Sequence, residues 1–241
     1  MIEKGTYRIG VSLKEVNNAL GLDLEEKDLE KILRQNSIMF RTVLPTEQLL
    51  ISAKSTIGKP YKRGASVLFD APEAFDCSSL VSWAAVESGY AIPRIAIDQY
   101  VYSQRIQSAD LKPGDLVFAN TKEIIHKEGL YFSKALNKIV KEEAIRTETL
   151  EYMPGTKVPE GVDHVGIYIG NNQIIHSSTK TGGAVIQNIN ESNSFKNIVG
   201  YGRITENEDK RFVIEIPHDR INMRTKEGLI REIKNLWQMK K

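Results

Sequence analysis

The chain has 241 residues, of which 41% are hydrophobic and 27% are charged, the composition of a globular protein with a buried core. Its formal net charge of +2 argues against a protein that binds nucleic acid through a strongly basic surface. No apolar run approaches membrane-spanning length, and the first residues lack the features of a secretion signal. We therefore expect a cytoplasmic protein that is not inserted in a membrane. The single cysteine, Cys77, excludes an internal disulfide.

The first 44 residues are predicted to be mostly helical. The segment SLKE, residues 12–15, has the pattern of a capping box, in which the serine and glutamate side chains bond to the backbone amides of a helix start. Leu29, Ile32 and Leu33 recur at helical spacing further along. A strand-like IMFRTVL follows, and Pro45 then marks a break before a predicted helix over residues 46–58.

The only cysteine falls where another helix is predicted to begin. In DCSSLVSWAAVESG, residues 76–89, Asp76 is a favourable N-cap and Gly89 a favourable stop. Cys77 then lies in the first turn, where unpaired amides and the helix dipole favour an anion. This position predicts a thiol of lowered pKa, hence a nucleophilic thiolate, with free amides able to hold a developing oxyanion. The alternative is a small buried hydrophobic residue.

The segment LKPGDLVFA, residues 111–119, predicts a turn followed by a strand. Residues 120–162 are rich in lysine and glutamate and predict an insertion that includes a helix around residues 132–140. The insertion leads into the strand that carries His164. It is interpreted either as a solvated surface excursion or as a lid over the site.

Two of the four histidines bracket a predicted hairpin in HVGIYIGNNQIIHSS, residues 164–178. If GNN forms a three-residue loop, Gly166 lies opposite His176, and His164 lies opposite Ser178. Both imidazoles then point to the same side of the sheet, whereas a two-residue loop would place them on opposite sides. The hypothesis is that His164 acts as general base toward Cys77, and that His176 fixes the tautomer of His164.

The blocks FDCSSLVSWAAVESGYAIPR, LKPGDLVFA and HVGIYIGNNQIIHSS resemble the NlpC-type cell-wall cysteine peptidases, and STIGKPYKRGA is similar to the opening of that family. The resemblance covers about residues 46–204, in the family's order. It implies a papain-like core and hydrolysis of cell-wall peptides at the bond between D-glutamate and a diamino acid. Ser79 departs from the family, which often has glycine at that position.

The resemblance implies three catalytic residues, Cys77 as nucleophile, His164 as base and His176 as the third polar member. It also implies that Tyr61, and Asp76 with Ser78, lie near the amine of the substrate or the oxyanion. No cofactor is expected. One cysteine and two hairpin histidines do not form a usual metal-ligand pattern, so no metal is expected either.

The two ends of the chain show a second resemblance. VSLKEVNNALGLDLEEKDLEKILRQNSI and FVIEIPHDRINMRTKEGLIREI are similar to the two halves of a small domain in the phenylalanyl-tRNA synthetase beta chain. This resemblance implies that residues 1–44 and 210–241 form one discontinuous helical domain, interrupted by a peptidase domain over residues 45–209. Two unrelated helical appendages are the alternative.

The predicted fold class is therefore α+β: a cysteine-bearing helix packed on an antiparallel sheet, plus a small helical domain made from both termini. The predicted function is hydrolysis of peptidoglycan-type peptides through a thiolate and an acyl-enzyme. A catalytically silent binding or adaptor protein, and a transferase or deamidase acting on other amides, are the alternatives. The expected partner is the peptide substrate; a protein partner on the terminal domain is a further hypothesis, whereas nucleic acid and membrane are not expected.

Overall fold

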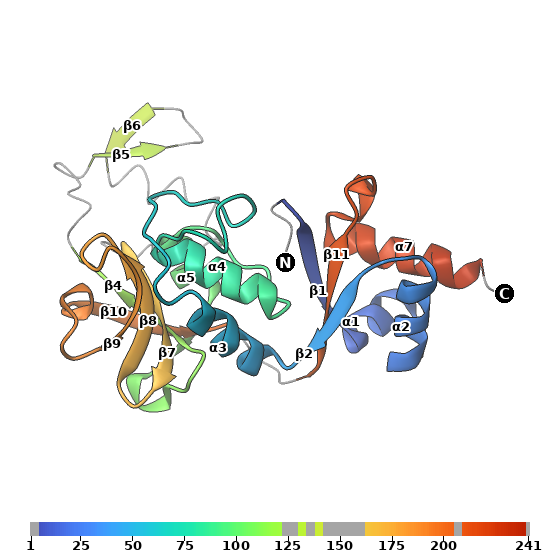
Figure 1. Ribbon diagram of the computed structural model, residues 1–241, viewed down its shortest axis with the longest axis horizontal. Helices are drawn as coiled ribbons and strands as arrows, with labels where there is room; N and C mark the ends of the chain where they lie inside the picture. Colours follow the sequence, from blue (N-terminus) through green and yellow to red (C-terminus); the bar gives the residue numbers. More distant parts are fainter. Residues whose placement is uncertain (1–4, 122–129, 134–137, 142–161, 205–208, 240–241) are drawn as a thin grey trace.

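The computed structural model describes residues 5–121, 130–133, 138–141, 162–204 and 209–239. Two antiparallel sheets, of six and three strands, organise most of these residues, and a helix that carries Cys77 lies between them (Figure 1). The larger sheet and its helices, within residues 45–204, are called the catalytic unit below. The smaller sheet and its helices, built from both ends of the chain, are called the terminal unit.

The catalytic unit is built on a six-stranded sheet with the order β3-β10-β4-β7-β8-β9. Its strands are β3 (Gln104–Ile106), β4 (Leu116–Ala119), β7 (His164–Gly170), β8 (Gln173–Ser178), β9 (Gly183–Asn188) and β10 (Ile198–Arg203). Its α-helices are α3 (Pro45–Ser55), α4 (Cys77–Glu87) and α5 (Ala96–Tyr102), and its short 3-10 helices are η1 (Ser108–Asp110) and η3 (Asn193–Phe195). All neighbouring strands run antiparallel.

Helix α4 packs on this sheet through apolar side chains, which the surrounding elements bury. Leu80, Val81 and Ala84 are fully buried and share one core with Phe118 of β4 and Ile167 of β7. The helix contacts both β7 and β8 and also lies against α3. The predicted α+β fold, with the cysteine helix on an antiparallel sheet in a papain-like core, is confirmed.

The β7–β8 hairpin has the predicted register but not the predicted turn. Gly170 pairs with Gln173, so the turn has only two residues, Asn171 and Asn172. Their φ angles of 51° and 56° lie in the left-handed region, as a tight hairpin turn of type I′ requires and as asparagine tolerates better than most residues. The predicted three-residue loop is therefore wrong.

An irregularity in β7 restores the register that the two-residue turn would otherwise break. The pairing shifts between Tyr168 and Gly170, so one extra residue is accommodated on this strand. Before that point Ile167 faces Ile175, which is the predicted register, and extending it to the start of β7 would place His164 opposite Ser178. The two imidazoles consequently share one face of the sheet, which is the geometry that the sequence predicted.

The terminal unit joins the two ends of the chain in a three-stranded sheet with the order β1-β11-β2. Its elements are β1 (Tyr7–Ser12), α1 (Leu13–Leu20), α2 (Glu26–Gln35), β2 (Phe40–Val43), β11 (Arg211–Ile216), η4 (Ile221–Met223) and α7 (Lys226–Gln238). Val11, Leu29 and Ile32 from the first segment share a buried core with Phe212 and Leu229 from the last. The predicted capping box at the start of α1 is present, whereas strand β1 was not predicted from the sequence.

The two units meet at the C-terminal end of α4. Glu87, in its last turn, is buried and forms ion pairs with Arg8 of β1 at 3.3 Å and with Arg41 of β2 at 2.6 Å. The backbones also approach closely, since a Cβ added to Gly10 would lie 2.0 Å from the carbonyl oxygen of Gly89. Any larger residue at position 10 would therefore push the two units apart.

Most of the predicted insertion, residues 120–162, lies outside the described residues, and the lid hypothesis rests on that segment. Its described part contains two paired antiparallel strands, β5 (Leu130–Ser133) and β6 (Lys138–Lys141), so the helix predicted around residues 132–140 is wrong. Within the described ranges, none of the helices combines the length and apolar character needed to cross a membrane.

Candidate active site

Cys77 occupies the first position of helix α4, where the sequence predicted it. Asp76 is the N-cap, and its Oδ1 accepts a hydrogen bond from the amide of Ser79 at 2.7 Å. The Ser79 hydroxyl in turn accepts from the Asp76 amide at 2.8 Å, completing a capping box. Ser79 is the residue where the resembled family often has glycine. Its hydroxyl therefore stabilises the helix start and fixes the backbone that carries Cys77.

The sulfur of Cys77 lies against the strand that carries His164. It is 3.9 Å from the carbonyl oxygen of Asp163, and the amide of Val165 also points to it. These two residues flank His164, so the thiol and the imidazole come from adjacent parts of the site. The amide of Ser78 in the helix start provides a further hydrogen bond to the sulfur.

The resting thiol is protonated, contrary to the prediction of a lowered pKa. Cys77 is half-buried, but protein atoms surround its sulfur, and this burial raises the pKa of the thiol to about 12. The charge of the neighbouring Asp76 carboxylate raises the pKa further, while hydrogen bonds from Val165 and Ser78 act in the opposite direction. The amides of the helix start therefore do not by themselves produce a thiolate in the unliganded site.

A chain of hydrogen bonds sets the proton positions on the two imidazoles. Nε2 of His164 lies 2.9 Å from Nδ1 of His176, and Nε2 of His176 lies 2.9 Å from Oε1 of Gln187. Since Oε1 can only accept, His176 carries its proton on Nε2, and its Nδ1 accepts from Nε2–H of His164. The Nδ1 atom of His164 is then unprotonated, as a general base requires.

Gln187 was not singled out from the sequence, although it completes this chain. It lies on β9, in which Val185 faces His176 directly, so residue 187 is the diagonal neighbour on the same face. The hydroxyl of Ser192 donates to the same Oε1 atom at 2.7 Å and orients the amide. Extending the register of the predicted hairpin to a third strand would have identified Gln187.

Phe195 of η3 encloses both imidazoles. Its ring centroid lies 5.1 Å from the centroid of His164 and 5.1 Å from that of His176, and the two histidine rings are nearly perpendicular to each other. Burial of this cluster lowers the pKa of His164 to about 3 and also lowers the pKa of His176. Both imidazoles are therefore neutral at neutral pH.

A cleft of about 510 Å³ opens beside this cluster. It is lined by Cys77 and His164 together with all three residues predicted to contact substrate, Tyr61, Asp76 and Ser78. His176 lies behind His164, where it is fully buried. The structure thus gathers five of the six predicted site residues at one cleft and the sixth directly behind it, while their catalytic and binding roles stay predictions.

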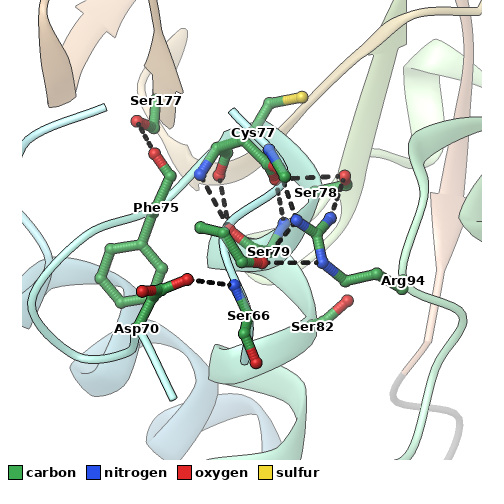
Figure 2. Close-up of polar contacts among 12 residues, drawn as sticks. Ser66, Asp70, Phe75, Cys77, Ser78, Ser79, Ser82, Arg94 and Ser177 are labelled. Carbon is green, nitrogen blue, oxygen red and sulfur yellow. Dashed lines mark hydrogen bonds and ion pairs between the residues drawn. The ribbon is translucent and has the colours of Figure 1, made fainter. Parts of the chain in front are cut away.

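Arg94, which the sequence analysis left without a role, anchors the helix start. Its guanidinium pairs with Oδ2 of Asp76 and donates to the Ser78 hydroxyl at 2.9 Å and to the carbonyl oxygen of Ala65 at 2.6 Å. Figure 2 shows this guanidinium directed at Ser78, next to Cys77. The carboxylate that precedes the cysteine is therefore paired with a cation and held in place.

Asp76 is less available to a substrate than its position in the cleft indicates. Oδ2 also accepts from the amide of Gly64 at 3.0 Å, and only 10% of the side chain is exposed. Its main roles in the unliganded site are to cap α4 and to join the loop at Gly64 to the cysteine. Among the residues that the structure describes, His, Cys, Asp and Glu side chains form no cluster of three or more able to hold a metal ion.

Comparisons with known proteins agree on the catalytic unit. The sequence profile of the NlpC/P60 family matches residues 58–153 and 133–203. The probable endopeptidase p60 of Listeria welshimeri is 31% identical over 156 residues, which are 65% of this chain and 22% of that protein. The bifunctional muramidase/DL-endopeptidase CwlT of Bacillus subtilis is 27% identical over 158 residues, which are 66% of this chain and 36% of that protein.

The chain thus spans about a fifth to a third of the length of these two curated relatives. Among solved structures, that of NlpC2 from Trichomonas vaginalis is 25% identical and has a TM-score of 0.47, covering 67% of this chain and 47% of that chain. The structure of the peptidoglycan hydrolase RipB from Mycobacterium tuberculosis is 22% identical with a TM-score of 0.45, covering 79% of this chain and 78% of that chain.

Proposed function

Because the chain belongs to the NlpC/P60 family, we propose that it is a cysteine peptidase of cell-wall peptides, with Cys77 as nucleophile and His164 as base. The observation that carries this proposal is the hydrogen-bond chain from Gln187 through His176 to His164, which leaves Nδ1 of His164 unprotonated in a residue that lines the same cleft as Cys77. A purely structural role for these residues would not require the protons to lie on Nε2 of both histidines.

The proposed reaction starts from a neutral thiol and a neutral imidazole. As the Cys77 sulfur attacks the carbonyl carbon of the scissile amide, the thiol proton passes to Nδ1 of His164. The negative oxygen that forms can accept a hydrogen bond from the Cys77 amide at the start of α4, where amides have no partner within the helix. Nδ1 of His176 accepts a hydrogen bond from the His164 imidazolium and thereby stabilises it. This nitrogen can accept because Gln187 keeps the proton of His176 on Nε2.

Collapse of this intermediate breaks the amide bond. The proton on His164 passes to the leaving nitrogen, and the acyl group remains on sulfur as a thioester. A water molecule then gives a proton to His164 as it attacks the thioester. The acid product forms as the sulfur leaves, and the proton returns from His164 to the sulfur. No oxidant, metal or cofactor takes part in this sequence.

The proposed scissile bond joins the γ-carboxyl group of D-glutamate to the amino group of a diamino acid. The resemblance of the active-site blocks implies this bond, and the DL-endopeptidase name of the Bacillus subtilis relative supports it. The cleft of about 510 Å³ is of the size that accommodates a short peptide rather than a folded protein.

Cleavage of a defined peptide tests the proposal. L-Alanyl-γ-D-glutamyl-L-lysine is incubated with the wild-type chain, and mass spectrometry is expected to detect L-alanyl-D-glutamate and free lysine. The Cys77→Ala variant is expected to lose at least roughly 10³-fold of this rate because no nucleophile remains. Its unfolding curve, measured in parallel, should match that of the wild type.

Other results would separate the alternatives. If the wild type binds the peptide but leaves it intact, the catalytically silent binding protein is the better description. If the wild type leaves this peptide intact but releases ammonia from its α-carboxamide counterpart, the chain is a deamidase. If it transfers the acyl group to an added amine in place of water, the chain is a transferase. Equal rates in the wild type and in Cys77→Ala would contradict the assigned nucleophile.

We also propose that residues 1–44 and 210–241 form one discontinuous domain into which the catalytic domain, residues 45–209, is inserted. Two observations support it: β11 lies between β1 and β2 in one sheet, and both chain segments contribute to one buried core. The junctions at Pro45 and before β11 also lie close together, because β2 and β11 are paired strands, with Val43 opposite Arg211. Such closeness permits one domain to interrupt another.

A further inference from the structure

The charged side chains that line the cleft differ in whether they already have an ion-pair or hydrogen-bond partner within the protein. Asp76 and Arg94 neutralise each other. Asp163 accepts hydrogen bonds from the amide and hydroxyl of Thr121 at 2.7 and 2.9 Å. Arg63, also in the lining, is exposed and has no ion-pair or hydrogen-bond partner among the described residues.

The backbone holds Arg63 close to the nucleophile. The amide of the next residue, Gly64, donates to Asp76, and Asp76 directly precedes Cys77 in the chain. Lys62, on the other side, is not part of the cleft lining and instead forms an ion pair with Asp70 at 2.5 Å. Two adjacent cations therefore have different environments: Lys62 is paired outside the cleft and Arg63 lines it unpaired.

An unpaired guanidinium beside a nucleophile is suited to a planar anion on the substrate. Arginine binds a carboxylate through two parallel hydrogen bonds, which fixes orientation as well as position. Arg94 cannot take this role without losing its bonds to Asp76, Ser78 and Ala65. Arg63 has no ion pair or hydrogen bond to the residues that the structure describes that it would lose on binding an anion.

The proposed substrate carries such an anion at a fixed distance from the scissile bond. When D-glutamate is linked through its γ-carboxyl group, its α-carboxylate remains free, and the carboxylate carbon is four bonds from the carbonyl carbon that sulfur attacks. In a lysine-containing peptide extended at its C-terminus, it is the nearest carboxylate to that bond, since the carboxyl group of the diamino acid is itself in an amide.

We propose that Arg63 is a specificity-determining residue that binds the free α-carboxylate of the γ-linked D-glutamyl residue. This inference rests on the proposed peptidase function and adds to it a preference: peptides with the free carboxylate are substrates, and peptides in which it is converted to the carboxamide are poor ones. The carboxamide lacks the charge and presents only one acceptor oxygen to the guanidinium.

Two peptides that differ only at this group test the proposal. L-Alanyl-γ-D-glutamyl-L-lysinamide is compared with its α-carboxamide counterpart, and kcat/KM is measured for both. The wild type is expected to prefer the carboxylate peptide roughly 10-fold to 100-fold, the range that a charge-assisted hydrogen bond supports. Arg63→Gln should reduce this ratio to near one, and Arg63→Lys should retain part of it.

Lys62→Gln is the matched control, because it removes the same charge one residue away and outside the cleft lining. It should keep the wild-type ratio. A ratio near one in the wild type, or an equal loss of the ratio in Lys62→Gln and Arg63→Gln, would overturn the role of Arg63.

Binding measurements separate failure of this inference from failure of the peptidase function. Dissociation constants of both peptides are measured by calorimetry with Cys77→Ala and with Cys77→Ala combined with Arg63→Gln. If the first binds the carboxylate peptide more tightly and the second does not, Arg63 has the proposed role even when the wild type cleaves neither peptide. If Cys77→Ala binds both peptides equally, the inference is wrong even when the wild type cleaves both.

Discussion

Each end of helix α4 has a buried carboxylate, and the helix dipole gives these two carboxylates opposite electrostatic environments. At the N-terminal end, Asp76 interacts favourably with the helix dipole and pairs with Arg94 of the same unit. At the C-terminal end, Glu87 lies near the negative pole, and its partners are Arg8 and Arg41 of the terminal unit. The reactive end is thus stabilised within the catalytic unit, whereas the other end depends on strands from the beginning of the chain.

A third arginine strengthens the contact at the C-terminal end. Nε of Arg211, at the start of β11, donates to the carbonyl oxygen of Gly89 at 2.9 Å, and its guanidinium lies over the ring of Tyr90. Arg211 also pairs with Glu15 at 3.0 Å, which links the beginning and the end of the chain. The terminal unit therefore supplies the cations that the end of the cysteine helix lacks.

Removal of residues 210–241 should have the largest effect, because β11 is the central strand of the terminal sheet. The edge strands β1 and β2 would lose their partner in that sheet, and the core of the unit would be opened. Hydrogen exchange is expected to show loss of amide protection over residues 7–43, with protection retained in the six-stranded sheet. Full protection of residues 7–43 in the shortened chain would contradict the discontinuous domain.

Glu87→Gln should have the next largest effect. It leaves Arg8, whose side chain is only 7% exposed, without its main counter-charge, although Glu215 lies 3.5 Å away and compensates in part. We expect a loss of about 3 kcal/mol in the free energy of unfolding, measured with urea. Glu30→Gln, which breaks a more exposed pair with Arg34, is the control and should cost less than about 0.5 kcal/mol. Equal losses of unfolding free energy in the two variants would mean that the arginines do not stabilise the C-terminal end of α4.

Asp76→Asn should have the smallest measured effect, a specific shift in the reactivity of the thiol. Asparagine still caps the helix, but it removes the carboxylate charge that raises the pKa of Cys77. The midpoint of the pH dependence of thiol alkylation should therefore move to lower pH, by roughly one unit. Asp70→Asn removes a similar charge from the pair with Lys62 and should leave the midpoint unchanged. An upward movement in Asp76→Asn would show that the carboxylate does not oppose thiolate formation.

Local patterns predicted those parts of the molecule in which neighbouring residues decide the conformation. The capping residue Asp76 and the apolar residues after Cys77 were enough to predict helix α4. The capping box at Ser12 and the strands around the hairpin were predicted for the same reason. Strand β1 was missed because its pairing partner, β11, lies about 200 residues further along the chain.

The hairpin shows how a correct result can follow from a wrong step. The alternation of β7 and β8 predicted that His164 and His176 share a face, yet the turn has two residues rather than three. The extra residue accommodated before Gly170 compensates for this difference. A bulge depends on how the two strands twist against their neighbours, so the local sequence does not indicate it.

The sequence alone predicted that Cys77 and His164 would meet, because capping, alternation and spacing along the chain place the cysteine helix and the histidine hairpin. Their protonation and their electrostatic partners depend on the folded arrangement. The pKa of a thiol or an imidazole depends on how many protein atoms exclude water from it and on which charges lie nearby. Arg94, Gln187 and Phe195, which set those conditions, come from three separate places in the chain and meet Cys77 and the two histidines only in the folded protein.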